Sequence, residues 1–150
     1  MPRNKLFAKL INKINRFWWW LTNPKTQGVK VFLINKNKIL LVRLTYYPNT
    51  WTYPGGGVDK GEDLKSTASR ECIEEVGIKP EKLKYIGSLD FDHEYKKDTV
   101  HIFISNLSEK VTPLIDGKEI AEARWFSLDD LPNIGRNAKK MLDLYLTKTV

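Results

Sequence analysis

The sequence predicts an α/β domain in which a mixed β-sheet carries helices on both faces. Short apolar segments rich in Val, Ile and Phe alternate with turn residues, and segments with helical periodicity lie between them. The chain has 150 residues, of which 41% are hydrophobic and 29% are charged, so it fits one domain of ordinary globular composition. Because strands come first and helices are interspersed, we expect one sheet that is covered on both sides.

The first predicted element is an amphipathic helix over residues 5–21. Its Leu, Ile and Phe side chains fall on one broad face, and Asn23-Pro24 ends the helix. We therefore divide the chain into a basic N-terminal helical segment, residues 1–24, and a main domain, residues 25–150.

Positive charge is concentrated in the first part of the chain. Residues 1–58 carry a charge of +10 and residues 59–150 carry −3, which gives the net charge of +7. Such an asymmetry is typical of proteins with an anionic partner. The aromatic run Trp18–Trp20 points in three directions on a helix, so it is predicted to cover the sheet edge, stack on a base or reach a lipid interface. Peripheral membrane contact through residues 1–21 is therefore one expectation.

The cysteine content and the apolar runs favour a cytoplasmic protein. Cys72 is the one cysteine, so the chain has no intramolecular disulfide, and its neighbours Glu74 and Glu75 do not favour a reactive thiolate. We interpret Cys72 as a small buried residue. The longest apolar run, Phe17–Leu21, is far shorter than the ~20 residues of a transmembrane helix.

The main domain is predicted to begin with a β-hairpin. Residues 29–34 and 39–44 are its strands, and residues 35–37 are its turn. Further strands are expected over residues 83–91, 99–105 and 121–126.

Two helices are predicted within this domain. The first covers residues 62–76, where an apolar residue recurs at every fourth position, and Gly77 ends it. The second is expected to be capped by Asn133 and to run to about Leu146. Its inward side chains would be Met141, Leu142, Leu144 and Tyr145.

Three carboxylates share one face of the first of these helices. Glu71, Glu74 and Glu75 are spaced i, i+3 and i+4, and like charges at this spacing destabilise a helix by a few tenths of a kcal/mol per pair. A hard divalent cation removes this penalty, because Mg²⁺ binds carboxylate oxygens and joins them to substrate phosphates. Arg70 lies four residues before Glu74 and is expected to hold that side chain.

A glycine run, Gly55–Gly57, precedes this helix. Without Cβ atoms, its backbone can approach an ion or a phosphate closely. The loop, the carboxylate helix and the glycine that ends the helix are thus predicted to form one site for a metal ion and a phosphate.

The same stretch resembles the Nudix box, G-x5-E-x7-R-E-U-x-E-E-x-G-U with U apolar. Gly56, Glu62, Arg70 and the three helix glutamates match its fixed residues, and the match continues to Ile78. Cys72 stands where an aliphatic residue is usual. The resemblance extends over about residues 28–146 and leaves the first helix outside.

The resemblance implies a Nudix-type α/β/α sandwich that hydrolyses a nucleoside diphosphate linked to another group. It implies Mg²⁺ or Mn²⁺ as cofactor, and it assigns metal ligation to Glu71, Glu74 and Glu75, the Gly55 carbonyl and Glu62. Arg70 would orient the glutamates, and water would attack a phosphorus atom.

Further roles follow from the same resemblance. Glu71 and Glu119 are the two candidates for the base that accepts the proton from water, and Arg43 with Gly56 would contact the substrate. The expected partner is a small nucleotide-type substrate, with no stable nucleic-acid complex; the sequence carries no signature of a particular substrate or of an oligomeric state.

Two alternatives to this function remain open at the level of the sequence. The first is a module that binds a nucleotide or an RNA 5′ end with little turnover; the intact acidic ligands argue against it. The second is a dinucleoside polyphosphate hydrolase, because Tyr95 lies 17 residues after Ile78, a spacing that resembles that of Nudix enzymes acting on such substrates.

Overall fold

The computed structural model describes residues 25–93, 96–115 and 117–149, together with Ile11. The helix expected over residues 5–21, including Trp18–Trp20, therefore lies outside the described residues except for Ile11, and so does Tyr95. Neither of the two helices described in full has the length and apolar character needed to cross a membrane.

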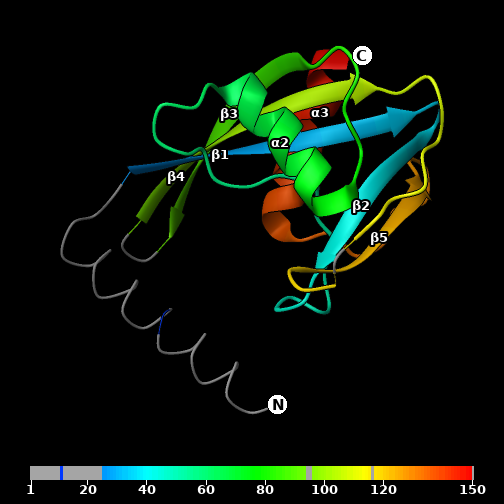
Figure 1. Ribbon diagram of the computed structural model, residues 1–150, viewed down its shortest axis with the longest axis horizontal. Helices are drawn as coiled ribbons and strands as arrows, with labels where there is room; N and C mark the ends of the chain where they lie inside the picture. Colours follow the sequence, from blue (N-terminus) through cyan, green and yellow to red (C-terminus); the bar gives the residue numbers. More distant parts are fainter. Residues whose placement is uncertain (1–10, 12–24, 94–95, 116, 150) are drawn as a thin grey trace.

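Five strands form one mixed sheet in the order β3-β4-β1-β2-β5 (Figure 1). The central strands β1 and β4 are parallel, and every other neighbouring pair is antiparallel. The strands are β1 (Lys25–Asn35), β2 (Lys38–Leu44), β3 (Lys84–His93), β4 (Lys96–Asn106) and β5 (Ile120–Ser127). The predicted hairpin and the three later strands are confirmed, with ends that differ from the prediction by up to four residues.

Alternating side chains of β1 divide the core into two parts. Val29, Val31 and Leu33 pack with the apolar stripe of α2 (Leu64–Val76), on one face of the sheet. Phe32 and Ile34 point to the opposite face, where α3 (Arg136–Thr149) supplies Ala138 and Met141. Figure 1 shows the two helices on opposite sides of the sheet. Both faces are therefore apolar, as the sequence predicts, and each fully buried aliphatic side chain contributes about 1.5–3 kcal/mol.

The ends of the helices differ from the sequence-based expectation in one case. The first helix begins at Leu64, where Asp63 caps it by accepting a hydrogen bond from the Ser66 backbone N–H at 3.0 Å, and it ends at Gly77 as predicted. Asn133 does not cap the last helix, which begins at Arg136. Its side-chain amide instead donates to the Asn49 carbonyl at 3.0 Å, so the prediction was wrong because a tertiary contact takes the side chain.

A connecting segment, residues 51–58, enters the sheet between β1 and β2. The Val42 N–H donates to the Thr52 carbonyl on one side, and the Val31 and Val29 N–H groups donate to the Pro54 and Gly56 carbonyls on the other. Only Ile34 and Asn35, at the end of β1, are therefore paired with β2. This inserted segment places the glycine run in the sheet, where it faces α2.

Candidate functional site

Gly55 occupies a position that no other residue could take without displacing the sheet. Its φ is +149°, and a Cβ atom there would lie 2.0 Å from the Val29 carbonyl oxygen. The carbonyls on either side of it, those of Pro54 and Gly56, accept hydrogen bonds from β1. Among the described residues, no donor binds the Gly55 carbonyl, the oxygen that the sequence analysis assigned to a metal ion.

Two of the three glutamates of α2 are in contact with this glycine loop. The Gly55 N–H donates to Glu75 Oε2 at 2.9 Å, and a Cβ on Gly56 would lie 2.5 Å from the Glu71 carboxylate. Glu75 is 9% exposed, and burial raises its pKa to about 7. Burial also raises the pKa of Glu71, against the opposing effect of Arg70. Burial thus outweighs the nearby positive charges, that of Arg70 for Glu71 and that of Lys30 for Glu75.

Arg70 connects the remaining acids to the loop. Its Nε donates to Glu62 Oε1 at 2.9 Å, and its Nη1 donates to Glu71 at 2.9 Å and to Glu74 at 3.1 Å. Its Nη2 donates to the Gly57 carbonyl at 3.2 Å. Hydrogen bonds from Arg70 lower the pKa of Glu62 to about 2. The orienting contacts that the resemblance implies for Arg70 are thus present in the structure.

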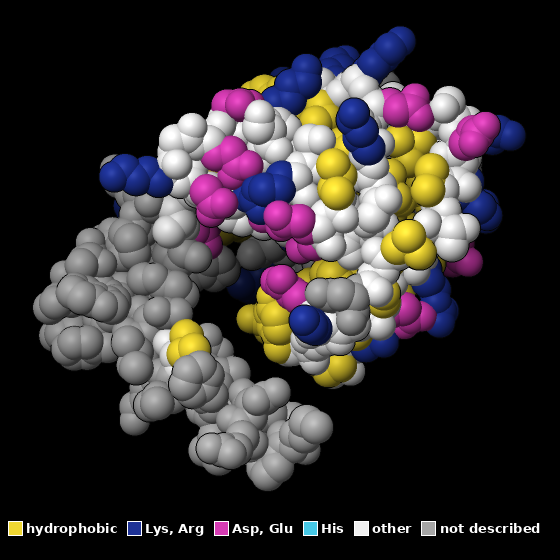
Figure 2. Space-filling view, in the orientation of Figure 1, with side chains coloured by type: hydrophobic (Ala, Val, Ile, Leu, Met, Phe, Trp, Pro, Cys, Tyr) yellow, Lys and Arg dark blue, Asp and Glu magenta, His cyan; other side chains and the backbone are white. Residues whose placement is uncertain are grey.

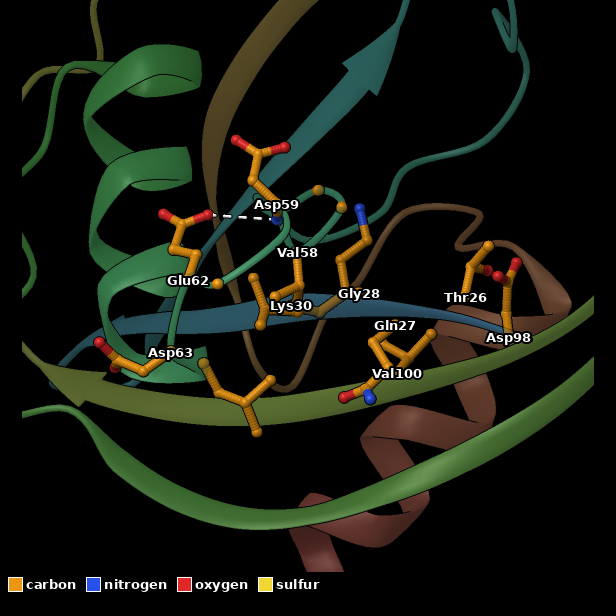
Figure 3. Close-up of a pocket in the computed structure, with 15 residues that line it drawn as sticks. Thr26, Gln27, Gly28, Lys30, Val58, Asp59, Glu62, Asp63, Asp98 and Val100 are labelled. Atoms are coloured by element: carbon orange, nitrogen blue, oxygen red, sulfur yellow. Dashed lines mark hydrogen bonds between the residues drawn. The ribbon is translucent and has the colours of Figure 1, made fainter. Parts of the chain in front are cut away.

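Glu62 also forms a hydrogen bond within the loop that precedes α2. Its second carboxylate oxygen accepts a hydrogen bond from the Asp59 backbone N–H at 3.3 Å, drawn as the dashed line in Figure 3. Figure 2 shows acidic and basic side chains next to one another on the side of the molecule that carries α2. This is the surface expected where Arg70 gathers several carboxylates.

The fold brings Glu119 to the same site from the far end of the chain. It directly precedes β5, and its carbonyl accepts a hydrogen bond from the Thr45 N–H at 2.9 Å. Its charge raises the pKa of Glu75 and of Glu71, which places the three carboxylates within electrostatic reach of each other. The sequence offered Glu119 only through the family resemblance, so its proximity to this site comes from the tertiary structure.

Arg43 lies at the end of β2 and is already paired. Its Nη2 donates to Glu122 Oε2 at 3.0 Å, and its guanidinium lies 5.9 Å from the centre of the Trp51 ring. A contact with substrate phosphate requires this ion pair to be shared or exchanged. Arg43 is therefore a less accessible cation than its position at a strand end suggests.

The acids fit a hard divalent cation in chemistry, but they are not arranged as a closed cage. Among the described residues, no group of three His, Cys, Asp or Glu side chains meets in ligand geometry. Arg70 separates Glu71 and Glu74, while Glu75 turns towards Gly55. All of the side-chain atoms that could bind a cation here are nevertheless oxygens. Burial raises the pKa values of Glu71 and Glu75, and a bound cation would lower them again.

Two hollows lie beside the glycine loop. The loop hollow, of about 920 Å³, is lined by the start of β1, residues 56–59 and the residues before α2 (Figure 3). The aromatic hollow, of about 450 Å³, lies on the α3 side and is lined by Tyr47, Trp51 and Phe91, with Asn137 and Met141 from α3. Lys30, Asp98 and Val100 line both.

Sequence reasoning assigned no function to Lys30 or Trp51, which line the aromatic hollow. A signal for Lys30 was present, since it interrupts an apolar strand at a position that alternates with the buried Phe32 and Ile34. For Trp51, only the tertiary structure brings the ring into one hollow with residues of α3.

Comparison with known proteins identifies the fold family. The NUDIX domain family matches residues 24–145. The chain belongs to the Nudix family. The geometry described above is therefore that of a Nudix box, and the sandwich of two helices around a mixed sheet is the fold that the resemblance implied.

Three similar proteins illustrate the range of this Nudix family. Diphosphoinositol polyphosphate phosphohydrolase 2 of Rattus norvegicus is 30% identical over 96 residues, which cover 63% of this chain and 52% of that protein. The NAD-capped RNA hydrolase NudC of Pseudomonas aeruginosa (strain LESB58) is 30% identical over 130 residues, 83% of this chain and 46% of that protein. The chain thus spans about half the length of these curated relatives.

A solved structure shows the same fold. The MutT NUDIX hydrolase from Burkholderia pseudomallei superposes with a TM-score of 0.73 and 22% identity, covering 85% of this chain and 99% of that one. At this identity the likeness establishes the architecture and leaves the substrate open.

Proposed function

We propose that this protein is a metal-dependent hydrolase that cleaves the diphosphate bond of a nucleoside diphosphate linked to another group. The observation that carries the proposal is a pair of carboxylates, the buried Glu75 and the partly buried Glu71, held against the glycine loop with raised pKa values. Buried acids of this kind are typical of sites that bind cations or transfer protons. The similar proteins named above include hydrolases of phosphorylated substrates.

Glu71, Glu74 and Glu75, with the Gly55 carbonyl, would hold Mg²⁺ or Mn²⁺, and Glu62 would hold the loop or a further ion. When bound, the metal neutralises phosphate charge and lowers the pKa of water. Arg70 keeps the carboxylates in place through the hydrogen bonds described above. Glu71 or Glu119 accepts the proton of the attacking water, and both lie within electrostatic reach of Glu75.

The two hollows suggest how such a substrate would lie. The aromatic hollow offers the rings of Tyr47 and Trp51 and the amide of Asn137, a setting suited to a nucleoside. The diphosphate would then lie at the glycine loop, next to the carboxylates.

The test is a panel of nucleoside diphosphate derivatives, dinucleoside polyphosphates and diphosphoinositol phosphates, assayed for phosphate or nucleotide release with Mg²⁺, with Mn²⁺ and with EDTA. We expect hydrolysis that EDTA abolishes and that Glu75→Gln reduces by about 10²–10⁴-fold. Glu81→Gln, an exposed acid beyond the C-terminal end of α2, is the matched control. Equal activity of the wild type and Glu75→Gln on every active substrate would disprove the mechanism. Binding without turnover would instead favour the nucleotide-binding module.

A further inference from the structure

Lys30 is a partly buried cation that the proposed mechanism does not use. On β1 its side chain points away from α2, because Val29 and Val31 on either side of it pack into the α2 core. Its ammonium group donates a hydrogen bond to the Tyr53 carbonyl at 3.0 Å. A lysine inside a sheet is costly unless its charge is compensated, so its presence needs a reason.

The position of Lys30 is next to the glycine loop. Tyr53, which accepts its hydrogen bond, is two residues before Gly55, and a Cβ on Gly55 would lie 2.9 Å from the Lys30 Cα. The residue lines the loop hollow (Figure 3), and it lines the aromatic hollow as well. Lys30 therefore stands where a ligand that fills both hollows would have to pass.

The carboxylates near Lys30 act on it through their charge, whereas the hydrogen bond that its ammonium group donates goes to a neutral carbonyl. Burial lowers the pKa of its ammonium group, and the carboxylates of Glu75, Glu71 and Glu119 oppose this effect. An ammonium group has three N–H donors, and among the described residues the Tyr53 carbonyl is the hydrogen-bond acceptor that the structure provides. A metal ion bound by the same carboxylates would neutralise the negative charge that they present to Lys30. The ammonium group would then be stabilised by an anionic group of the ligand.

We propose that Lys30 binds the substrate by donating a hydrogen bond to a non-bridging phosphate oxygen of its diphosphate group. This inference rests on the proposed function, because it takes a diphosphate as the ligand. A charge-assisted hydrogen bond in a buried setting favours an anionic oxygen over the neutral groups of a nucleoside. Lys30 thereby binds the diphosphate group of the substrate, while the aromatic hollow receives the ring of its nucleoside.

The experiment measures binding by calorimetry in EDTA, with inorganic diphosphate and the nucleosides adenosine, guanosine and uridine as probes. Lys30→Met should weaken the binding of diphosphate by about tenfold to 100-fold and leave nucleoside binding within about threefold. Lys30→Arg should restore diphosphate binding to within about threefold of the wild type. Lys79→Met, which removes an exposed charge beyond α2, should change neither ligand.

Three results would overturn the inference. They are unchanged diphosphate affinity in Lys30→Met, equal loss of diphosphate and nucleoside binding, and no diphosphate binding by the wild type at millimolar concentration. Lys30→Arg retains the positive charge at this position of the sheet. If Lys30→Met alone has a folding defect, the diphosphate affinity of Lys30→Arg decides the outcome. If the wild type hydrolyses nothing in the substrate panel yet shows the selective effect of Lys30→Met, the proposed function fails and the phosphate contact stands.

Discussion

The two faces of the sheet carry different parts of the same site. On the α2 face, charged groups lie close together in the chain, with Glu62 to Glu75 gathered by Arg70. On the α3 face, the aromatic hollow is assembled from segments that are distant in the chain, such as Tyr47, Phe91 and Met141. The comparison shows that the acidic cluster comes from one compact motif, whereas the aromatic hollow is assembled from distant segments of the chain.

The largest expected effect comes from breaking the loop that joins the two faces. In Gly55→Ala the new Cβ would overlap the Val29 carbonyl at a φ that alanine avoids, so we expect the free energy of unfolding to fall by at least about 3 kcal/mol. Gly57→Ala is the control, since nothing lies within 4 Å of the Cβ position, and its change should stay below about 0.5 kcal/mol. Urea denaturation measures both, and equal stabilities would show that the loop is not constrained as described.

Removing the guanidinium of Arg70 tests the α2 face alone. Arg70→Met frees the carboxylates of Glu62, Glu71 and Glu74, and displacement of catalytic groups by about 1 Å costs about 100-fold in rate. We expect kcat to fall by about this factor with little change in KM. Arg124→Met, which removes an arginine that is 63% exposed, serves as control. A larger change in KM than in kcat would assign Arg70 to substrate binding instead.

The buried carboxylate of Glu75 should make stability depend on pH in metal-free protein. Its pKa is raised from 4.5 to about 7 in the folded state, so the folded protein binds more protons than the unfolded chain between these values. The contribution of Glu75 to stability is therefore largest below about pH 4.5 and is lost as the pH rises through about 7, by no more than about 1.4 kcal/mol per pH unit. Denaturation in EDTA from pH 4.5 to 7.5 measures this, with Glu75→Gln as reference. A slope that Glu75→Gln does not reduce would contradict the assignment.

The smallest effect is expected on the α3 face. The Tyr53 hydroxyl, buried in that core, donates to the Ala138 carbonyl at 2.9 Å. Tyr53→Phe removes this bond with little change in shape, so we expect a loss of about 1 kcal/mol of stability and unchanged kcat. Thermal denaturation and steady-state kinetics check the two parts. A drop in kcat would show that the α3 face reaches the reacting groups more directly than the contacts indicate.

Much of the fold could be predicted because its information is local. The strands follow apolar alternation, and Gly77 ends α2 in the left-handed conformation, with φ of +67°, that favours glycine. Asn133 was misjudged for the opposite reason, since its contact with Asn49 joins residues 84 positions apart, and sequence periodicity carries no information on such a contact.

For the candidate site, the sequence by itself determined which acidic groups lie together. The spacing of Glu71, Glu74 and Glu75 places them on one helix face, and the glycines precede that helix, because helical geometry relates residues three and four apart. The tertiary structure alone decided that the loop enters the sheet between β1 and β2, that Glu119 reaches Glu75 and that Lys30 meets Tyr53. These contacts depend on strand order, which is set by the burial of two apolar faces over the whole domain.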